Sequence, residues 1–315
     1  MRTEAPNSAP LGAIRAVPVR HPLRWAAAAV VLVLAAMFAH MLVTNPNFDW
    51  DQVRHYLTNA HILSGVLATF WLTAAAMAIG ITGGAVLALM RLSENPMVAV
   101  ASWLYTWFFR GTPVLVQLIF WYNLQLLIGN ISLGIPFGPI FATFNTNALD
   151  TTYMAAVLGL GLNEAAYMSE IIRAGIISVE QGQSDAALAL GMRHLQVMRR
   201  IVLPQAARVI IPPTGNETIS MLKATSLVSI IAVTDLLKAT EDISSVNYQV
   251  IPLLLVASIW YLILTSALSA GQYYLERHYN RGSPGPRPAP MQLLRRNLTT
   301  FHVRPTVPRR PGGGA

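Results

Sequence analysis

The sequence predicts an all-α, polytopic membrane protein, and three observations support this fold class. First, 54% of the 315 residues are hydrophobic and only 11% are charged, whereas soluble domains carry about 25% charged residues. Second, the apolar residues gather in segments of roughly 20 residues, the length that an α-helix needs to cross a bilayer. Third, the basic residues are concentrated in the tails and in alternate connections between these segments.

Six spans are expected from the apolar segments. Residues 1–24 form a Pro- and Ala-rich tail that we expect to be poorly ordered. An additional N-terminal span follows at 25–44; a cleaved signal peptide is the competing interpretation, but the long polar lead favours an uncleaved anchor. The Pro-, Arg- and Gly-rich tail 281–315 is expected to be disordered. The remaining spans lie within a transmembrane domain at 60–280, at 64–90, 114–128, 152–172, 208–237 and 251–272.

Charge placement predicts the orientation. All of the 22 basic residues except Arg54, Lys223 and Lys238 fall in the two tails or in the connections after the second and fourth spans. Because Lys and Arg accumulate on the cytoplasmic side, both termini are predicted to be cytoplasmic in a multi-pass protein of the cytoplasmic membrane. Arg110 is assigned to the same side, where its side chain is expected to reach the headgroup level.

The segment 184–204, within the connection 176–207, is the water-facing stretch with the most distinct pattern. Ser184 is a good N-cap, and Asp185 places a negative charge at the positive end of the helix dipole. Ala186 and Ala187 follow in a short helix with a small face. Gly191 is expected to end this helix in the left-handed conformation.

A second helix is expected to begin near His194 and to carry Arg199. It is predicted to stop before Pro204, because proline disfavours helical backbone at Leu203. The alanine face of this helix–glycine–helix element allows another protein to approach closely. On this hypothesis, Ala187→Trp would leave membrane insertion intact and block docking.

These residues resemble the cytoplasmic coupling loop of ABC importer permeases. Residues 185–187 (Asp-Ala-Ala), Gly191 and 201–204 (Ile-Val-Leu-Pro) match its pattern E-A-A, three residues, G, nine residues, I-x-L-P, with Asp in place of Glu. The segments 109–118 and 163–173 are similar to the polar amino acid branch of the family. A third segment, 215–227, departs at Ala224, where the family usually has an acidic residue.

The resemblance implies a type I ABC importer permease fold, with five core helices and the N-terminal span as an addition. It also implies alternating access, and partners that the sequence itself does not contain. These are an ABC ATPase dimer that docks on the 184–204 loop, a second permease copy (identical or related), and a solute-binding protein that delivers a polar amino acid. Beyond these and the membrane lipids, no nucleic acid partner is expected.

The motifs of catalysis and nucleotide binding are missing from the sequence. A P-loop needs Gly-Lys-Ser/Thr, but both lysines, Lys223 and Lys238, follow leucines. His-Glu-x-x-His and Gly-x-Ser-x-Gly are also absent, as is cysteine. We therefore expect a non-catalytic transport subunit without cofactors of its own, with ATP and Mg bound by the partner ATPase.

Ionisable residues inside spans are candidates for the substrate path, because they are costly in a membrane. Glu170 and Arg173 are spaced to pair with each other, three residues apart on a helix. Glu164 is the best candidate to contact substrate, although a structural role is equally open, and an acidic path would suit a cationic amino acid. The full set of candidates is Asn163, Glu164 and Tyr167 in the fourth span and Glu217 and Lys223 in the fifth.

Rival interpretations remain at the level of the sequence. The fourth-span carboxylates would also suit an ion-coupled secondary transporter or channel that acts without an ATPase. A membrane-embedded enzyme and a basic tail that binds nucleic acid are weaker alternatives. Only the coupling loop argues directly for an ATP-driven importer, since a lone transporter does not need it.

Overall fold

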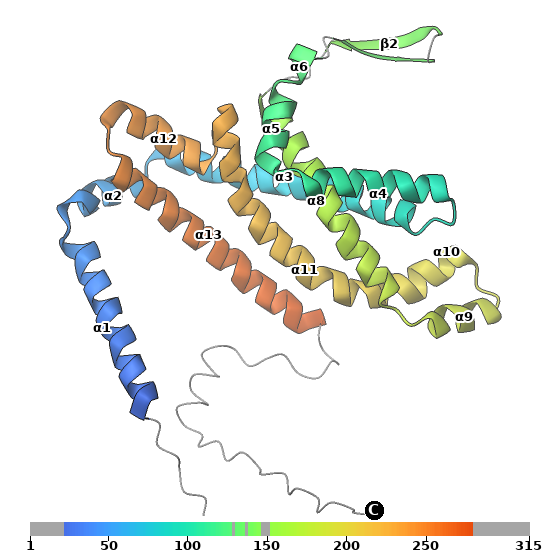
Figure 1. Cartoon of the computed structure of the whole chain (residues 1–315), viewed down its shortest axis with the longest axis horizontal. Coiled ribbons are helices and arrows are strands. Elements are labelled where there is room, and N and C mark those ends of the chain that lie inside the picture. The colour runs from blue at the N-terminus through green and yellow to red at the C-terminus, as the bar shows by residue number, and fades with distance from the viewer. Residues whose placement is uncertain (1–21, 128–129, 136–137, 146–151, 280–315) are drawn as a thin grey trace, which may run out of the picture. The chain divides into compact units, whose positions relative to one another are not determined.

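The computed structural model describes residues 22–127, 130–135, 138–145 and 152–279 (Figure 1). The described chain divides into two units, one that holds helix α1 and one that begins at Asn45. The predicted tails, 1–24 and 281–315, lie outside the described residues, apart from Pro22–Arg24 at the start of α1.

Helix α1 (Pro22–Thr44) confirms that the first predicted span is helical. Ala, Val and Leu are distributed around the whole circumference of the helix, so it presents no distinct polar face. Its apolar side chains, such as Leu32 and Phe38, are exposed within the chain. Such a helix is suited to contact with lipid on all sides.

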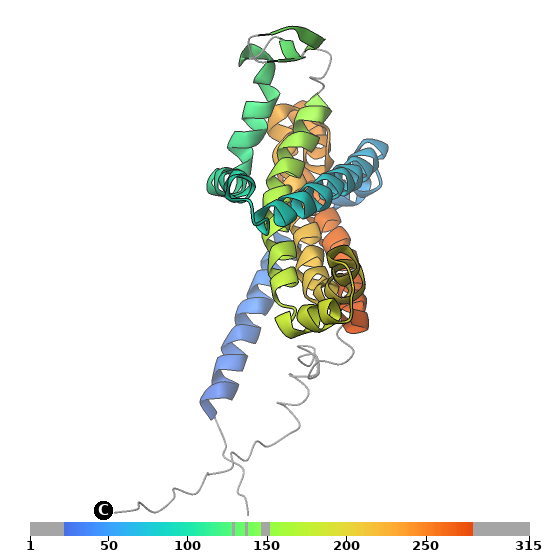
Figure 2. The same cartoon turned by 90° about the vertical axis from the view of Figure 1, so that its right-hand side faces the viewer.

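The second unit is a set of helices with one β-hairpin. Figure 2 shows α8 running along the length of this unit, with α3 crossing it and α4 seen nearly end-on to the side. In chain order the elements are η1 (Pro46–Phe48), α2 (Trp50–Leu57), α3 (Ala60–Arg91), α4 (Pro96–Gly111), α5 (Val114–Tyr122), α6 (Leu124–Leu127), β1 (Asn130–Gly134), β2 (Ile140–Asn145), α8 (Thr152–Ile177), α9 (Gln181–Ala189), α10 (His194–Val197), η2 (Met198–Val202), α11 (Leu203–Ala224), η3 (Thr225–Ile231), α12 (Leu236–Asn247) and α13 (Val250–Tyr279).

Among the described residues, three helices are long and apolar enough to cross a membrane: α1 over Trp25–Thr44, α3 and α13. A fourth candidate is the helical run His194–Ile231 with α12, which bends by 42° at a short break. The predicted spans 64–90 and 251–272 therefore coincide with α3 and α13. The fourth predicted span is α8, which is long but less apolar, because it contains Asn163, Glu164 and Glu170.

The third predicted span, 114–128, is not a single helix. Helix α5 ends at Tyr122, where the backbone N–H and the side-chain amide of Asn123 both donate to the carbonyl of Ile119. The short helix α6 and an antiparallel hairpin follow, with Asn130 opposite Asn145. Apolar composition continues past Tyr122, but the asparagine gives the chain a local way to leave the helix.

Pro212 and Pro213 lie in the fifth predicted span, where prolines would be expected to interrupt a helix, but they do not interrupt it. Both lie inside the continuous helix α11, which packs against α8 and α13. The side chain of Gln272 on α13 donates to the carbonyl of Pro212 at 3.3 Å. Packing against neighbouring helices therefore retains a helix that proline disfavours.

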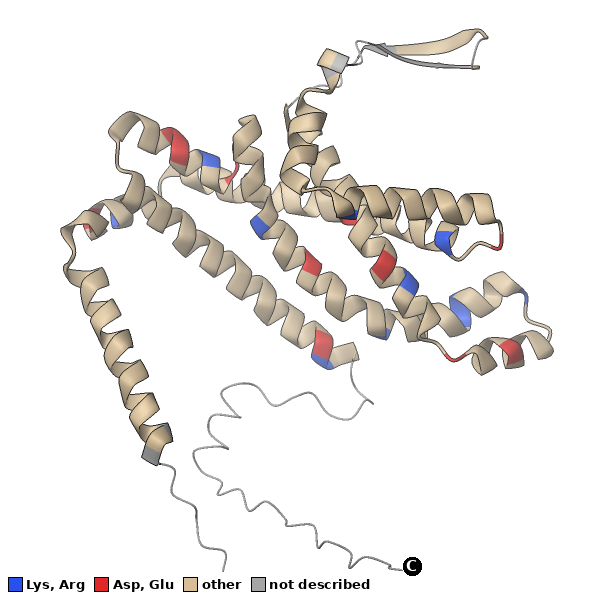
Figure 3. Ribbon diagram, in the orientation of Figure 1, with Lys and Arg blue, Asp and Glu red and all other residues tan. Residues whose placement is uncertain are grey.

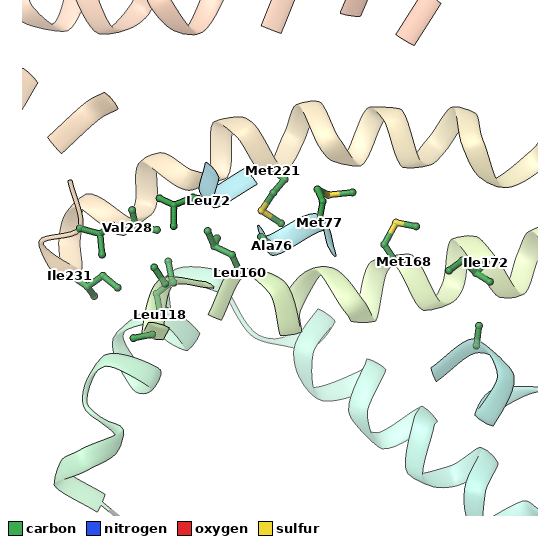
Figure 4. Close-up of a cluster of buried hydrophobic side chains, with 14 residues drawn as sticks. Leu72, Ala76, Met77, Leu118, Leu160, Met168, Ile172, Met221, Val228 and Ile231 are labelled. Atoms are coloured by element: carbon green, nitrogen blue, oxygen red, sulfur yellow. The ribbon is translucent and has the colours of Figure 1, made fainter. Parts of the chain in front are cut away.

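Helices α3 and α8 share the most extensive contact in the described part of the chain, and glycines make their close approach possible. A Cβ atom at Gly80 would lie 2.4 Å from Cγ of Glu164, and one at Gly84 would lie 2.5 Å from Cβ of Met168. The four-residue spacing of Gly80 and Gly84 is typical of such a close helix contact. Around it, Figure 4 shows Leu72, Met77, Leu118, Leu160, Met168 and Met221 directed toward one another in one buried cluster.

Candidate functional site

The predicted coupling element is present as a helix–glycine–helix structure between α8 and α11 (Figure 1). Its first helix, α9, begins at Gln181 with Glu180 as the N-cap, so Ser184 lies inside the helix and the predicted N-cap is wrong. Only residues 178–180 separate α8 from α9, and the helix therefore starts as soon as the chain has turned.

Gly191 ends α9 as predicted. Its φ of +81° is in the left-handed region. The N–H of Gly191 donates to the carbonyl of Leu188 at 2.9 Å, and the N–H of Met192 donates to that of Ala187 at 3.2 Å. These two bonds form a Schellman motif, which supplies donors to carbonyls at the end of the helix.

Ala187 is buried and is not part of the exposed face of α9. It is 4% exposed and packs with Val197 and Val202 in a small core inside the element. The neighbouring residues Asp185, Ala186 and Ala189 are exposed instead. An Ala187→Trp substitution would therefore disturb the element itself, and the hypothesis that it acts only on docking is wrong.

The second helix begins at His194 as predicted, but it does not stop before Pro204. Met198–Val202 form one π-helical turn, and α11 continues from Leu203 through Pro204. Proline lacks an N–H, and a π turn already disturbs the regular hydrogen-bond ladder at this point, so the helix continues with a changed register. Arg199, Leu203 and Pro204 are all exposed.

Asn163 is engaged in a buried hydrogen-bond network, which sequence reasoning did not identify. Its amide donates to the carbonyl of Phe109 at 2.9 Å and to Oε1 of Gln117 at 3.2 Å. The amide of Gln117 donates in turn to Phe109 and Thr112. The network holds the corner between α4 and α5 against α8. The only sequence signal for it was the presence of Gln117 and Asn163 in apolar helices.

Glu164 is the most deeply placed acid of the predicted path. It is 3% exposed, and its Oε1 atom has no hydrogen-bond partner in the described structure. Gly80 packs directly against its side chain. A buried carboxylate oxygen without a donor is costly, so this position marks a site where a donor or a cation would be favourable.

Arg110 packs on Tyr167, which follows Glu164 by three residues on α8. The guanidinium carbon of Arg110 lies 5.3 Å from the centre of the Tyr167 ring. The charge of Arg110 also acts on Glu217, and Glu217 interacts electrostatically with Glu164. Arg110 is exposed and lies over the Tyr167 ring of α8, and its position at the headgroup level stays a prediction.

The other predicted charges have simpler roles. Arg173 and Glu170 form an ion pair at 2.7 Å, as predicted from their spacing. Lys223 is exposed and forms no ion pair with any residue that the structure describes. It therefore does not neutralise Glu217 or Glu164. Figure 3 shows that charged residues are sparse along α13 and more frequent around α9–α11.

Comparison with known proteins gives the family. A family model described as "Binding-protein-dependent transport system inner membrane component" matches residues 80–281. The chain belongs to this family. This inner membrane component is 48% identical over 272 residues to the arginine transport system permease protein ArgU of Corynebacterium glutamicum, covering 86% of this chain and 84% of ArgU.

Two further comparisons agree. The inner membrane component is 36% identical over 212 residues to the histidine/lysine/arginine/ornithine transport system permease protein HisM of Salmonella typhimurium, covering 67% of this chain and 86% of HisM. A solved structure described as an amino acid ABC transporter with histidines is 36% identical, with a TM-score of 0.58, and the match covers 69% of this chain and 94% of that one. The match supports a type I ABC permease fold.

Proposed function

We propose that this chain is the permease subunit of an ATP-driven importer of cationic amino acids in the cytoplasmic membrane. The names of ArgU and HisM support the substrate class. The glutamates support it independently, because Glu164 and Glu217 form no ion pair among the described residues and would favour a positively charged solute.

One observation carries the coupling to ATP. The α9–α10 element has its own small core and an exposed outer face, and it is joined directly to α8 and α11. Those two helices carry Glu164, Tyr167 and Glu217. A partner that moves this element therefore moves the helices that bear the charged cluster, as alternating access requires.

The proposal includes the partners that such an importer needs. An ABC ATPase dimer binds ATP and Mg and docks on the exposed face of α9, with Asp185 and Ala186 at the contact. A second permease copy completes the path, and a solute-binding protein delivers the amino acid. In this assembly the chain is a non-catalytic transport subunit, with both of its termini in the cytoplasm.

The experiment is uptake of radiolabelled L-arginine into proteoliposomes that contain the permease, its ATPase and its solute-binding protein. Uptake is expected only when ATP is enclosed with the ATPase. Ion gradients without ATP serve as the control. Uptake driven by an ion gradient in the absence of the ATPase would contradict the proposal and would favour a secondary transporter.

A further inference from the structure

The charged cluster contains a cation that belongs to the chain itself. Arg110 comes from the end of α4, Tyr167 from the interior of α8 and Glu217 from the interior of α11. The guanidinium carbon of Arg110 lies 5.3 Å from the centre of the Tyr167 ring, within the range of a cation–π interaction. Its positive charge also acts on Glu217.

The cluster is short of positive charge and of hydrogen-bond donors. Glu164 and Glu217 interact with each other, and Oε1 of Glu164 is buried without a partner. Lys223 lies on the same helix as Glu217, but it is exposed and forms no ion pair within the described residues. Arg110 is also exposed and forms no ion pair within the described residues, so its charge acts on Glu217 from beyond ion-pair distance, and no donor of the described chain reaches Glu164.

We propose that Arg110 is a built-in substitute for the cationic side chain of the transported solute. In the empty permease it covers the ring of Tyr167 and partly neutralises Glu217, and it must move aside when the solute binds. This inference rests on the proposed function for the class of solute. A guanidinium suits the role, because it stacks on an aromatic face and is only weakly hydrated.

Competition between Arg110 and the solute lowers the affinity of the permease for the solute, which helps the solute to leave. The solute binds only to the fraction of permease in which Arg110 has left Tyr167 and Glu217, so its apparent dissociation constant is raised by that fraction. The return of Arg110 then favours release of the solute. An importer gains from such release, because a solute that is held tightly in the path leaves slowly.

The test is equilibrium binding of radiolabelled L-arginine to the full-length permease in complex with its ATPase, in lipid nanodiscs without the solute-binding protein. Arg110→Gln is expected to lower the Kd for arginine about tenfold, if Arg110 occupies the site for about nine-tenths of the time. Arg110→Lys retains the charge but not the flat stacking surface, so its Kd is expected to lie between those of the unaltered permease and Arg110→Gln. Arg208→Gln, which removes an exposed arginine elsewhere, is the matched control and should have no effect.

The double variant Arg110→Gln/Glu217→Gln separates competition from other roles. Without Glu217, Arg110 has little hold on the site, so the tenfold gain should disappear when Arg110→Gln is compared in the Glu217→Gln background. An unchanged or raised Kd in Arg110→Gln would overturn the inference, since a group that binds the solute's carboxylate would give weaker binding. If the Gln variant fails to assemble, Arg110→Met is read by the same criteria.

The two proposals fail differently. If the unaltered importer takes up arginine but Arg110→Gln binds it no more tightly, only the role of Arg110 is wrong. The same holds if no variant binds arginine in a complex that imports it. Absence of ATP-driven arginine uptake by the unaltered importer would instead remove the proposed function, and this inference with it.

Discussion

At Gly80, a hydrogen atom in place of a side chain sets the distance between α3 and α8. A methyl group there would lie 2.4 Å from Cγ of Glu164 and 2.8 Å from its Cβ. The close approach of the two helices also buries the Glu164 carboxylate. The glycine therefore determines both the packing of the pair and the environment of the acid.

Gly80→Ala is expected to lower the thermal stability of the purified permease, because overpacking of this kind costs about 1–3 kcal/mol. The measurement is the melting temperature in detergent. Gly271→Ala is the matched control, since Gly271 is also helical but has nothing within 4 Å of an added Cβ. Equal melting temperatures for the two variants would contradict the close packing at Gly80.

Asn163→Leu is expected to destabilise the corner between α4 and α5. The substitution leaves Oε1 of Gln117 without its donor, and a buried acceptor without a partner costs about 1–3 kcal/mol. Melting temperature again reports the effect, with Gln183→Ala on the exposed surface of α9 as the control. An unchanged melting temperature for Asn163→Leu would show that the network contributes little to stability.

The sequence indicated which acidic residues would be buried, but not which side chains from other helices would lie near them. The burial of Glu164 and the pairing of Glu170 with Arg173 could be predicted from an apolar span and a three-residue spacing. The position of Arg110 beside Tyr167 could not be predicted from the sequence. It follows aromatic residues that are typical of a headgroup region, and only the packing of α4 against α8 brings it to Tyr167.

At the scale of the element, α9 combines a buried and an exposed alanine in adjacent positions. Ala187 belongs to the small core of the element, whereas Ala186 faces outward. This pair makes it possible to test the docking surface separately from the folding of the element.

Ala186→Trp is expected to abolish ATP-driven uptake and co-purification of the ATPase, because the indole blocks close approach, while the melting temperature of the permease is unchanged. Ala187→Trp is the matched control and should lower the melting temperature instead, by overpacking worth about 1–3 kcal/mol. Normal uptake with Ala186→Trp would exclude this face of α9 as the contact with the ATPase.

Element boundaries were predictable where apolar length alone determined them. The helices α1, α3 and α13 follow from their composition, and the end of α9 follows from Gly191. The start of α9, the end of α5 and the passage of α11 through its prolines did not follow. In each case competing local signals were present. The short connection after α8 decided the start of α9, Asn123 decided the end of α5, and packing against α13 kept α11 helical at its prolines.

For the whole molecule, orientation in the membrane is the property that the charge pattern predicts. The α9–α10 element should face the cytoplasm, and α12, at the other end of α11, should face the exterior. The described part of α12 carries Lys238, which pairs with Asp242, and His61 lies 3.6 Å from the same carboxylate.

Single-cysteine labelling tests this orientation directly, because the sequence contains no cysteine. Gln183→Cys on α9 should react with a membrane-impermeant maleimide only in inside-out vesicles. Ser245→Cys on α12 should react only in intact cells or spheroplasts. Both residues are exposed, so access depends on the side of the membrane. The reverse pattern would place the proposed docking face outside the cell.

The glycine-mediated fit between α3 and α8 also limits how the permease can move. Two helices that interlock at Gly80 and Gly84 have no room to slide past each other, so we expect them to move together as one rigid body. Helix α9 follows α8 after a connection of three residues, so a displacement of α9 is passed on to this helix pair. A displacement of α9 on the cytoplasmic side would therefore also move the ends of α3 and α8 at the opposite surface of the membrane. The hinges of the permease must then lie outside this helix pair.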